Sequence, residues 1–313
     1  MTAALLSVRD LRVSFPPRAG RPEVRAVEQV SFDIAAGETL GLVGESGSGK
    51  TTTGRAILQL QPVSGGSVRL LGRELVGMRR GELRSMRRHM QFVQQNPYAS
   101  LHPRMTVAQA LAEPLRLHRA VSPARIAERV AELMSLVGLD PAMVRRYPHE
   151  FSGGQRQRIV IARALAVNPD FVVCDEPVSA LDVRTQAQIV ELLHRLQERL
   201  GLSYLFIAHD LAIVRAVAHR VAVMYGGRIV ELGGSGEVLG APAHPYTQTL
   251  LAAVPIPDPA RQRARLASAA IELDFRGAPP AADDEATWHE VAPGHGVSGH
   301  FWPAGTPRPG RRS

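Results

Sequence analysis

The chain has 313 residues, of which 45% are hydrophobic and 21% charged, proportions that are ordinary for a folded globular protein. It has one cysteine, Cys174, which excludes an internal disulfide framework, and the absence of an apolar run of about 18 residues argues against a transmembrane helix. The formal net charge of +8 would suit a nucleic-acid-binding protein, but aromatic residues make up only 5% and form no basic-and-aromatic pattern for stacking bases, so we expect no nucleic acid partner.

The first elements that the sequence predicts are strands. Residues 11–15 and 30–34 alternate apolar and polar side chains, which is the pattern of half-buried strands. Residues 43–58 read VGESGSGKTTTGRAIL, a strand end and a glycine-rich turn followed by a helix that we expect to end near Pro62. Residues 64–75 then predict a further strand with a turn at Gly72.

The glycine-rich turn has the residues of a phosphate cradle. Gly44, Gly49, Lys50 and Thr51 satisfy the pattern G-x-x-x-x-G-K-S/T. In such a loop the backbone N–H groups and the helix N-terminus face the phosphates, the lysine reaches the β- and γ-phosphates, and the hydroxyl ligates Mg²⁺. The flanking strand and helix favour this interpretation over a turn that only caps a helix. We therefore expect nucleotide contacts from Gly44, Glu45, Ser46, Gly47, Ser48, Gly49, Lys50, Thr51 and Thr52.

Helical patterns dominate between residues 100 and 168. Ser122 is expected to cap a helix that has Pro123 at its first position. One face of that helix would carry Ile126, Val130, Leu133 and Val137. A second helix is expected after Ser152, with its end at Asn168-Pro169. This stretch predicts a helical subdomain inserted into a sheet.

From residue 171 strands and helices alternate. FVVCDEP at 171–177 is a short apolar run of the kind buried in a parallel sheet, and it ends on Asp175 and Glu176. Asp175 is placed to hold magnesium through water and Glu176 to act as the base for an attacking water; two solvated acids at a sheet end are the alternative. Cys174 is expected to be a core residue.

The following segments extend the same alternation. A helix is expected from Asp182 to Gly201, then the buried strand SYLFIAHD at 203–210, and then a hairpin over 221–232 that turns at Gly226-Gly227. Parallel strands joined through helices predict an α/β sheet with right-handed crossovers.

A second anion-binding turn decides between classes of phosphate-binding protein. Residues 151–155 read FSGGQ, which places a hydroxyl and two glycines at a helix start. Here the chain resembles the ATP-binding subunits of ABC transporters. The resemblance rests on motifs that occur in one order over most of residues 8–232, namely GESGSGKTT at 44–52, QQNPYASL with Gln95, FSGGQ, VVCDEP at 172–177, SALD at 179–182 and HD at 209–210.

This resemblance implies a fold and a set of residue roles. The fold is that of a P-loop NTPase, with a RecA-like core, an antiparallel β subdomain and an α-helical subdomain inserted at about 96–165. Phe15 would stack on adenine, although a strand residue facing the core is the alternative. Gln95 would complete the magnesium shell with Thr51 and Asp175. The catalytic residues would be Glu176, which polarises the water, with His209, Gln95 and Lys50 at the γ-phosphate.

The resemblance also implies partners. Ser152, Gly153, Gly154 and Gln155 would bind the ATP of an opposite subunit in a head-to-tail dimer, and Asp182 would help to join the two halves. The expected cofactors are ATP and Mg²⁺. The expected partners are a second ATPase subunit, identical or paralogous, two transmembrane permease subunits and, indirectly, an extracytoplasmic solute-binding protein. With no basic leader before an apolar segment in the first 15 residues, we expect the cytoplasmic face of the cell membrane.

The cargo is a narrower question. HPYTQTLLAAVP at 244–255 and NPYASLHPR at 96–104 resemble the dipeptide, oligopeptide and nickel branch of the family. The main hypothesis is therefore an ATPase that powers the import of di- or oligopeptides, and the alternative is the same role for nickel, glutathione or another solute. A soluble ABC ATPase acting on ribosomes or DNA is less favoured, because such chains usually carry two cassettes or a long coiled insertion. A P-loop kinase is not favoured either, because such an enzyme would have no reason to carry the FSGGQ segment.

The chain is expected to divide into an ATPase domain at 1–254 and a C-terminal extension at 255–313. Both tryptophans, Trp288 and Trp302, lie in the extension, which predicts that part of it packs on the main body. The end of the extension resembles a segment of this branch in which several members carry clustered cysteines that can hold an iron–sulfur cluster. This chain has none after Cys174, so we expect no such cluster. A metal site at His289, His295 and His300 is not favoured, since these residues lack helical spacing and neighbouring cysteines.

Overall fold

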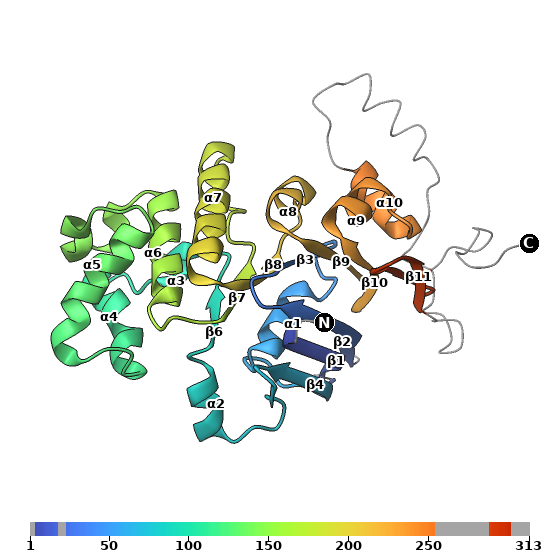
Figure 1. Ribbon diagram of the computed structural model, residues 1–313, viewed down its shortest axis with the longest axis horizontal. Helices are drawn as coiled ribbons and strands as arrows, with labels where there is room; N and C mark the ends of the chain where they lie inside the picture. Colours follow the sequence, from blue (N-terminus) through green and yellow to red (C-terminus); the bar gives the residue numbers. More distant parts are fainter. Residues whose placement is uncertain (1–3, 18–22, 254–287, 302–313) are drawn as a thin grey trace, which may run out of the picture.

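Two β-sheets organise the part of the chain that the computed structural model describes, residues 4–17, 23–253 and 288–301 (Figure 1). The smaller sheet is antiparallel and has the strand order β2-β1-β4-β5. Its strands are β1 (Ala4–Phe15), β2 (Val24–Ala35), β4 (Gly65–Leu70) and β5 (Arg73–Glu74). The predicted alternation is confirmed in β1, where the side chains of Leu6, Val8, Leu11 and Val13 are fully buried. The predicted turn at Gly72 connects β4 to β5.

The larger sheet has the order β11-β12-β10-β9-β3-β8-β7-β6 and is parallel from β9 to β6. Its strands are β3 (Thr39–Val43), β6 (Met90–Val93), β7 (Phe171–Asp175), β8 (Ser203–Ile207), β9 (Arg220–Tyr225), β10 (Arg228–Gly234), β11 (Trp288–Ala292) and β12 (His295–Ser298). Every residue of β3, β7 and β8 is buried, as expected for central parallel strands. Cys174 lies among them and is fully buried, and burial raises the pKa of its thiol.

The helices fall into two groups (Figure 1). Those near the sheets are α1 (Lys50–Ile57), α2 (Arg80–Met86), α7 (Val183–Leu200), α8 (Leu211–Val217), α9 (Ser235–Gly240) and α10 (Pro245–Ala252). At one end of the molecule lie α3 (Pro97–Ser100), α4 (Val107–Leu117), α5 (Ile126–Leu136) and α6 (Gly153–Leu165), with the short 3₁₀ turns η1 (Pro123–Arg125), η2 (Pro141–Arg145) and η3 (Pro148–Glu150). Within the described ranges, no helix combines the length and the apolar composition needed to span a membrane.

Most helix ends follow the sequence signals, with three exceptions. One is α6, which ends at Leu165, before the predicted end at Asn168-Pro169. Asp182 caps α7 by accepting from the Thr185 N–H, and Gly201 ends that helix in the left-handed conformation, as predicted. α1 ends at Ile57, five residues earlier than Pro62, because the chain turns at Gln59, which has a φ of 53°. Ser122 precedes the 3₁₀ turn η1, and its side chain makes no capping hydrogen bond.

The described part of the C-terminal extension joins the large sheet. β12 pairs with β10, so residues 288–301 pack on the main body as predicted; Trp302 lies outside the described residues. Fully buried Glu231 on β10 accepts from the Ala243 and His244 N–H groups at 2.8 and 3.0 Å. Its carboxylate also lies 2.7 Å from Nε2 of His295 on β12. One carboxylate therefore joins β10, β12 and the start of α10.

His244 adds a second connection to the same segment. Burial lowers the pKa of His244 to about 4, so its ring is neutral at pH 7. The N–H of Tyr246 donates to Nδ1, and Nε2 donates to the carbonyl oxygen of His300 at 3.0 Å. The ring therefore caps α10 and holds residue 300 at the same time.

We expect Glu231→Ala to lower the thermal unfolding midpoint by several degrees. The change leaves up to three buried donors without their acceptor, and each such group costs about 1–3 kcal/mol. Scanning calorimetry would measure the shift, with Glu198→Ala, an exposed carboxylate on α7, as the matched control. Equal midpoints for the two variants would show that Glu231 does not stabilise this part of the sheet.

Candidate functional site

The loop between β3 and α1 has a positive φ, which favours glycine, at Gly44, Gly47 and Gly49. Gly44 has a φ of 147° and Gly49 a φ of 104°. A Cβ on Gly44 would lie 2.1 Å from the Met224 carbonyl oxygen, and one on Gly49 would lie 2.3 Å from that of Ala26. The glycines of the predicted cradle are therefore required by its packing against β9 and β2 as well as by its curvature.

Lys50 lies at the first position of α1 and turns back into this loop. Its Nζ donates to the Gly44 and Glu45 carbonyl oxygens, both at 2.7 Å, and lies 3.3 Å from the Ser48 hydroxyl. Burial lowers the pKa of the Lys50 amine, against the effect of the nearby carboxylates of Glu176 and Asp175. The amine is thus held in the loop at the point where the N-terminus of α1 opens.

Asp175 faces the same loop from the end of β7. Its Oδ1 accepts from the Thr51 hydroxyl at 2.8 Å. Burial raises the pKa of Asp175, and the hydroxyl of Thr51 and the charge of Arg55 act in the opposite direction. A hydroxyl and a carboxylate side by side are hard oxygen ligands of the type that Mg²⁺ prefers, so the donor set at this position fits that ion.

Glu176 is the centre of a second cluster at the same edge of the sheet. The Gln95 amide donates to its Oε2 at 2.8 Å, and Nδ1 of His209 lies 3.4 Å from its Oε1. Gln95 follows β6, Glu176 follows β7 and His209 follows β8, so three neighbouring parallel strands deliver the three side chains. Ligands of open α/β sheets bind at this carboxyl end of the strands.

The backbone of Glu176 is also strained. Its φ is 48°, a value uncommon for a residue with a side chain, and its N–H donates to the Ile207 carbonyl oxygen of β8 at 2.9 Å. Strain of this kind persists where the surrounding structure holds it, and it concentrates at functional sites. The strand-to-strand hydrogen bond fixes the carboxylate between Gln95 and His209.

The FSGGQ segment forms the N-terminus of α6. Ser152 accepts from the Gln155 N–H at 3.3 Å, and the Gln155 side chain accepts from the Ser152 N–H at 3.0 Å, so the pair makes a capping box. A Cβ on Gly154 would lie 2.4 Å from Cγ2 of Thr185, which shows how closely α6 packs on α7. Asp182, at the N-terminus of α7, bonds to the N–H and the hydroxyl of Thr185.

The two predicted anion sites belong to different parts of the molecule. α1 packs against β1, β2, β7 and β8, whereas α6 packs against α3, α4, α5, α7 and β6. Lys50 and Ser152 therefore lie at the starts of two helices that share none of these packing partners. Phe15 lies at the end of β1, and the residue is 38% exposed, so it does not face the core. Its role at adenine stays a prediction.

Two family models match this chain. Residues 27–179 match the family described as ABC transporter, and residues 230–276 match the one described as oligopeptide/dipeptide transporter, C-terminal region. The chain belongs to the ABC transporter family. Its second match places it with the oligopeptide and dipeptide branch, to which the sequence motifs after residue 244 also point.

Curated relatives of this ABC transporter chain are glutathione import ATP-binding proteins named GsiA. Those of Shigella flexneri serotype 5b and Escherichia coli are each 54% identical to it over 264 residues, and that of Salmonella paratyphi A is 53% identical over 266 residues. Each alignment covers 83% of this chain, but the chain spans only 42–43% of the length of these relatives.

Solved structures with the same fold are ABC cassettes. The dimeric structure of the ATP-binding cassette MJ0796 bound to ADP and Pi is 28% identical, with a TM-score of 0.66 over 74% of this chain and 98% of that one. The structure of cbiO1 from Clostridium perfringens, part of the ABC transporter complex cbiONQ, is 25% identical, with a TM-score of 0.68 over 76% of this chain and 91% of that one. The α/β fold with an inserted helical group is thus the fold of ABC ATPase cassettes.

The structure adds one residue of this ABC cassette that sequence reasoning missed. The hydroxyl of Tyr246 accepts from the Glu45 N–H of the P-loop at 3.1 Å, and its ring packs on Tyr225 with 4.4 Å between centroids. Tyr246 lies in the HPYT motif, which the sequence offered only as a family signature. Because 201 residues separate donor and acceptor, no local pattern could have revealed the contact.

Proposed function

We propose that the chain is the ATP-hydrolysing subunit of a membrane ABC importer that takes up di- or oligopeptides. The observation that carries this proposal is the position of Glu176, which lies between Gln95 and His209 at the carboxyl edge of the sheet that also bears the P-loop. A carboxylate on a strained backbone, with two polar side chains beside it, suits a base that acts on water next to a bound triphosphate.

Each side chain of the site then has a task in the reaction. The cradle at 44–52 holds the ATP phosphates, with Lys50 at the β- and γ-phosphates. Glu176 takes a proton from a water molecule while the oxygen of that water forms a bond to the γ-phosphorus. The bond from the γ-phosphorus to the β–γ bridging oxygen breaks, and that oxygen leaves with ADP. Gln95 and His209 orient the reacting groups. Mg²⁺, held by Thr51, Asp175 and Gln95, would neutralise charge on the phosphates.

The proposed assembly is a head-to-tail dimer with ATP at both seams. Within one chain α6 packs on other elements than α1 does, and we infer that Ser152, Gly153, Gly154 and Gln155 at its N-terminus bind a phosphate of another subunit. Asp182 at the start of α7 would contact the same seam. The dimeric structure of the similar cassette MJ0796 supports this arrangement. The second ATPase subunit is identical or paralogous.

The proposed surroundings are two permease subunits at the cytoplasmic face of the cell membrane and an extracytoplasmic solute-binding protein. The match of residues 230–276 to the oligopeptide and dipeptide branch supports a peptide cargo, and the similarity to glutathione import proteins keeps glutathione as the alternative within this class. We divide the chain into an ATPase domain at 1–254 and an extension at 255–313, whose strands β11 and β12 complete the sheet of the first.

Co-purification from the native cell tests this proposal. Tagged Glu176→Gln would be solubilised in mild detergent with ATP and Mg²⁺, and its partners identified by mass spectrometry, with tagged Lys50→Ala as the control that should not hold the ATP-bound assembly. We expect two multi-span membrane proteins and a solute-binding protein. Ribosomal or DNA-bound partners without a membrane protein would contradict the transport function and leave the ATPase chemistry standing.

A further inference from the structure

The segment that follows β12 is connected to the P-loop by a row of three aromatic rings. Phe301, which is 8% exposed, packs edge-on against Tyr225 at the end of β9, with 5.0 Å between the ring centroids and 89° between the ring planes. Tyr225 in turn packs on Tyr246 of α10, and the hydroxyl of Tyr246 accepts from the Glu45 N–H at 3.1 Å. These three rings, the aromatic row, make a continuous path of contacts from the C-terminal extension to the P-loop.

Phe301 is held in its place by an uncommon backbone conformation and by close packing. Its φ is 55°, which is unfavourable for a residue with a bulky side chain, and such strain persists only where the surrounding structure holds it. Its ring lies over Gly226, where a Cβ would come within 2.6 Å of Cζ of Phe301. The ring and the backbone of Phe301 are therefore both fixed against the turn that joins β9 to β10.

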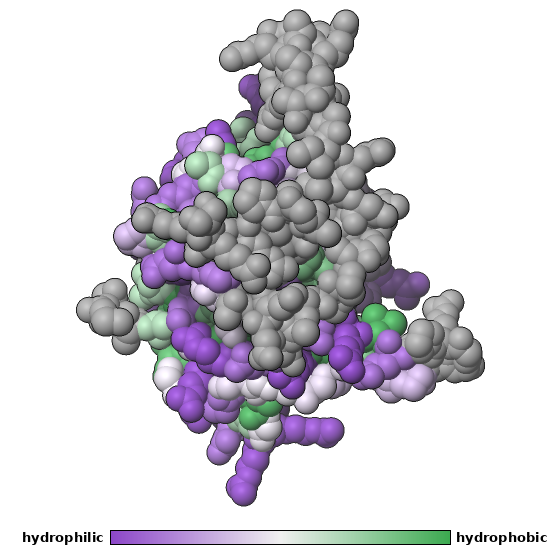
Figure 2. Space-filling view, turned by 90° about the vertical axis from the view of Figure 1, so that its right-hand side faces the viewer, coloured by the Kyte–Doolittle hydropathy of each residue, from purple (hydrophilic) through white to green (hydrophobic). Residues whose placement is uncertain are grey.

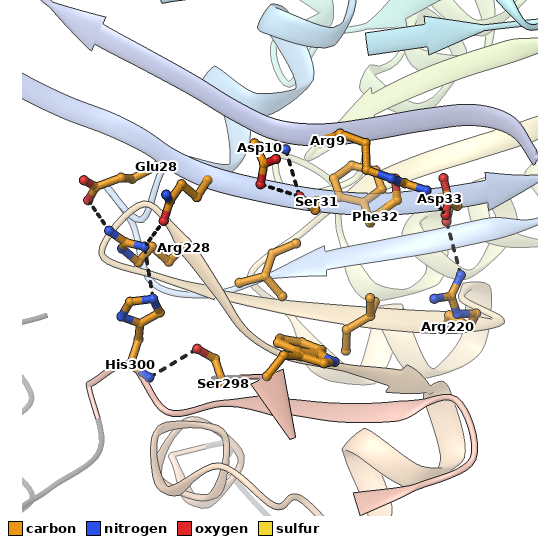
Figure 3. A pocket seen from close by; sticks show the side chains of 14 residues that line it. Arg9, Asp10, Glu28, Ser31, Phe32, Asp33, Arg220, Arg228, Ser298 and His300 are labelled. Atoms are coloured by element: carbon orange, nitrogen blue, oxygen red, sulfur yellow. Dashed lines mark hydrogen bonds and ion pairs between the residues drawn. The ribbon is translucent and has the colours of Figure 1, made fainter. Parts of the chain in front are cut away.

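His300, the neighbour of Phe301, is bonded to several elements around it. Figure 3 shows it at the edge of a cavity of about 550 Å³ between β2, β10 and β11, with its ring toward Arg228 and its backbone toward Ser298. Its Nε2 lies 3.0 Å from Nη1 of Arg228 on β10, and its N–H donates to the Ser298 hydroxyl at 3.2 Å. Its carbonyl oxygen accepts from the ring of His244, the residue that caps α10. These bonds fix the chain immediately before Phe301.

The P-loop residues at the other end of the aromatic row are those that hold Lys50. The Glu45 carbonyl oxygen and the Ser48 hydroxyl both contact the Lys50 amine. The N–H of Glu45 is bonded to Tyr246, and the carbonyl oxygen of Ser48 accepts from the Gly227 N–H at 3.1 Å. The backbone that presents Lys50 is therefore held at two points by α10 and by the β9–β10 turn, the segments on which the extension packs.

The outer surface at this end of the molecule favours a role for the extension within the fold over a role in docking another protein. Figure 2 shows this side, and where described residues are visible they are mainly hydrophilic, with hydrophobic residues in small separate patches. Broad apolar patches mark protein contacts, and none is visible among the described residues in this view. The rings of Tyr246 and Phe301 are buried instead, where they contact the elements that support the P-loop.

We propose that Tyr246 and Phe301 are positioning residues of the nucleotide site, through which the C-terminal extension holds the P-loop in the conformation that binds ATP. The hydroxyl of Tyr246 fixes the Glu45 N–H directly, and Phe301 acts through the rings of Tyr225 and Tyr246. A loop that is ordered before the nucleotide arrives loses less conformational freedom on binding, so its affinity is higher. The inference rests on the proposed function for its ATP site, but not for the cargo or the permease subunits.

Isothermal titration of the full chain with adenylyl imidodiphosphate and Mg²⁺ tests the proposal in Tyr246→Phe. This change removes only the hydroxyl and leaves the ring on Tyr225, so the Kd should rise about fivefold, the effect of one lost hydrogen bond. At saturating ATP the hydrolysis rate should stay within about twofold, because the loop holds the phosphates equally in the ground state and the transition state. Tyr204→Phe, which removes a buried hydroxyl that donates to the Leu193 carbonyl oxygen, is the matched control and should leave the Kd unchanged. An unchanged Kd in Tyr246→Phe would overturn the proposal, whereas no binding by the unaltered chain would overturn the nucleotide site itself.

A double variant tests whether Phe301 acts through Tyr246. Phe301→Leu keeps a buried apolar side chain but removes the edge-on ring contact, so it should raise the same Kd about threefold. In a Tyr246→Phe background the same change should have a smaller effect, because the effects of residues that act through one another do not add. An unchanged Kd in Phe301→Leu, or the same factor in both backgrounds, would show that the aromatic row does not connect the extension to the P-loop.

Discussion

Glu176→Gln is expected to reduce ATP hydrolysis by about a thousandfold or more while leaving ATP binding intact, since loss of a general base typically costs about 10²–10⁴ in rate. Glutamine has the same shape and can occupy the same strained position, where the Ile207 carbonyl oxygen holds the backbone N–H. What it lacks is the negative charge and the basicity of a carboxylate, because an amide oxygen accepts hydrogen bonds but does not take a proton from water. The variant should therefore stay folded and lose only the ability to hydrolyse ATP.

Phosphate release would measure turnover, and a fluorescent ATP analogue would measure affinity. Because the ATP-bound state is no longer consumed, light scattering should detect a dimer of the variant in ATP and Mg²⁺. Glu191→Gln, an exposed carboxylate on α7, is the matched control and should behave as the unaltered chain does. Rapid hydrolysis by Glu176→Gln would remove Glu176 from the role of base.

The parts of the site that could be predicted are those in which short motifs fix both the backbone and the chemistry. The P-loop pattern specifies a strand, a glycine turn and a helix, so the place of Lys50 follows from eight adjacent residues. The neighbourhood of Gln95, Glu176 and His209 follows from a general rule, because parallel strands end at one edge of the sheet. These three residues lie far apart in the sequence, and the strand order alone brings them together.

The parts that could not be predicted depend on pairings between distant segments. His295 meets Glu231 across 64 residues, and nothing in either segment specifies the partner. The histidines of the extension looked like a weak metal pattern, yet the structure pairs His295 with a buried carboxylate and His300 with Arg228. The cavity between β2, β10 and β11 likewise needs three distant segments in one place, which no local period encodes.

Ser152→Arg is the second change with a large expected effect, and it tests whether two chains share each site. An arginine at the N-terminus of α6 adds bulk and positive charge at the place where we propose that the partner's ATP binds. Removing such a phosphate ligand costs about 10²–10³ in rate, so hydrolysis should fall by that factor or more. ATP affinity of the isolated chain should not change, because the helices that begin at Ser152 and Lys50 pack on different elements.

Two controls separate this effect from a loss of the helix cap. Ser152→Ala removes the cap, worth about 1 kcal/mol, without adding bulk or charge. Ser122→Arg places the same side chain at another exposed helix start, where no capping bond exists, and should leave hydrolysis unaltered. If Ser152→Arg lowered ATP affinity as steeply as Lys50→Ala, Ser152 would belong to the site of its own chain.

Mixing the two inactive variants gives the sharpest result. A dimer of one Lys50→Ala chain and one Ser152→Arg chain has one seam with an intact P-loop facing an intact FSGGQ segment, and one seam with both altered. Random pairing yields such mixed dimers half of the time, so about a quarter of all seams should be restored. Phosphate release by the mixture should therefore exceed that of either variant alone. If each chain instead completed its own site, mixing would restore nothing, because every site would still carry one of the two changes.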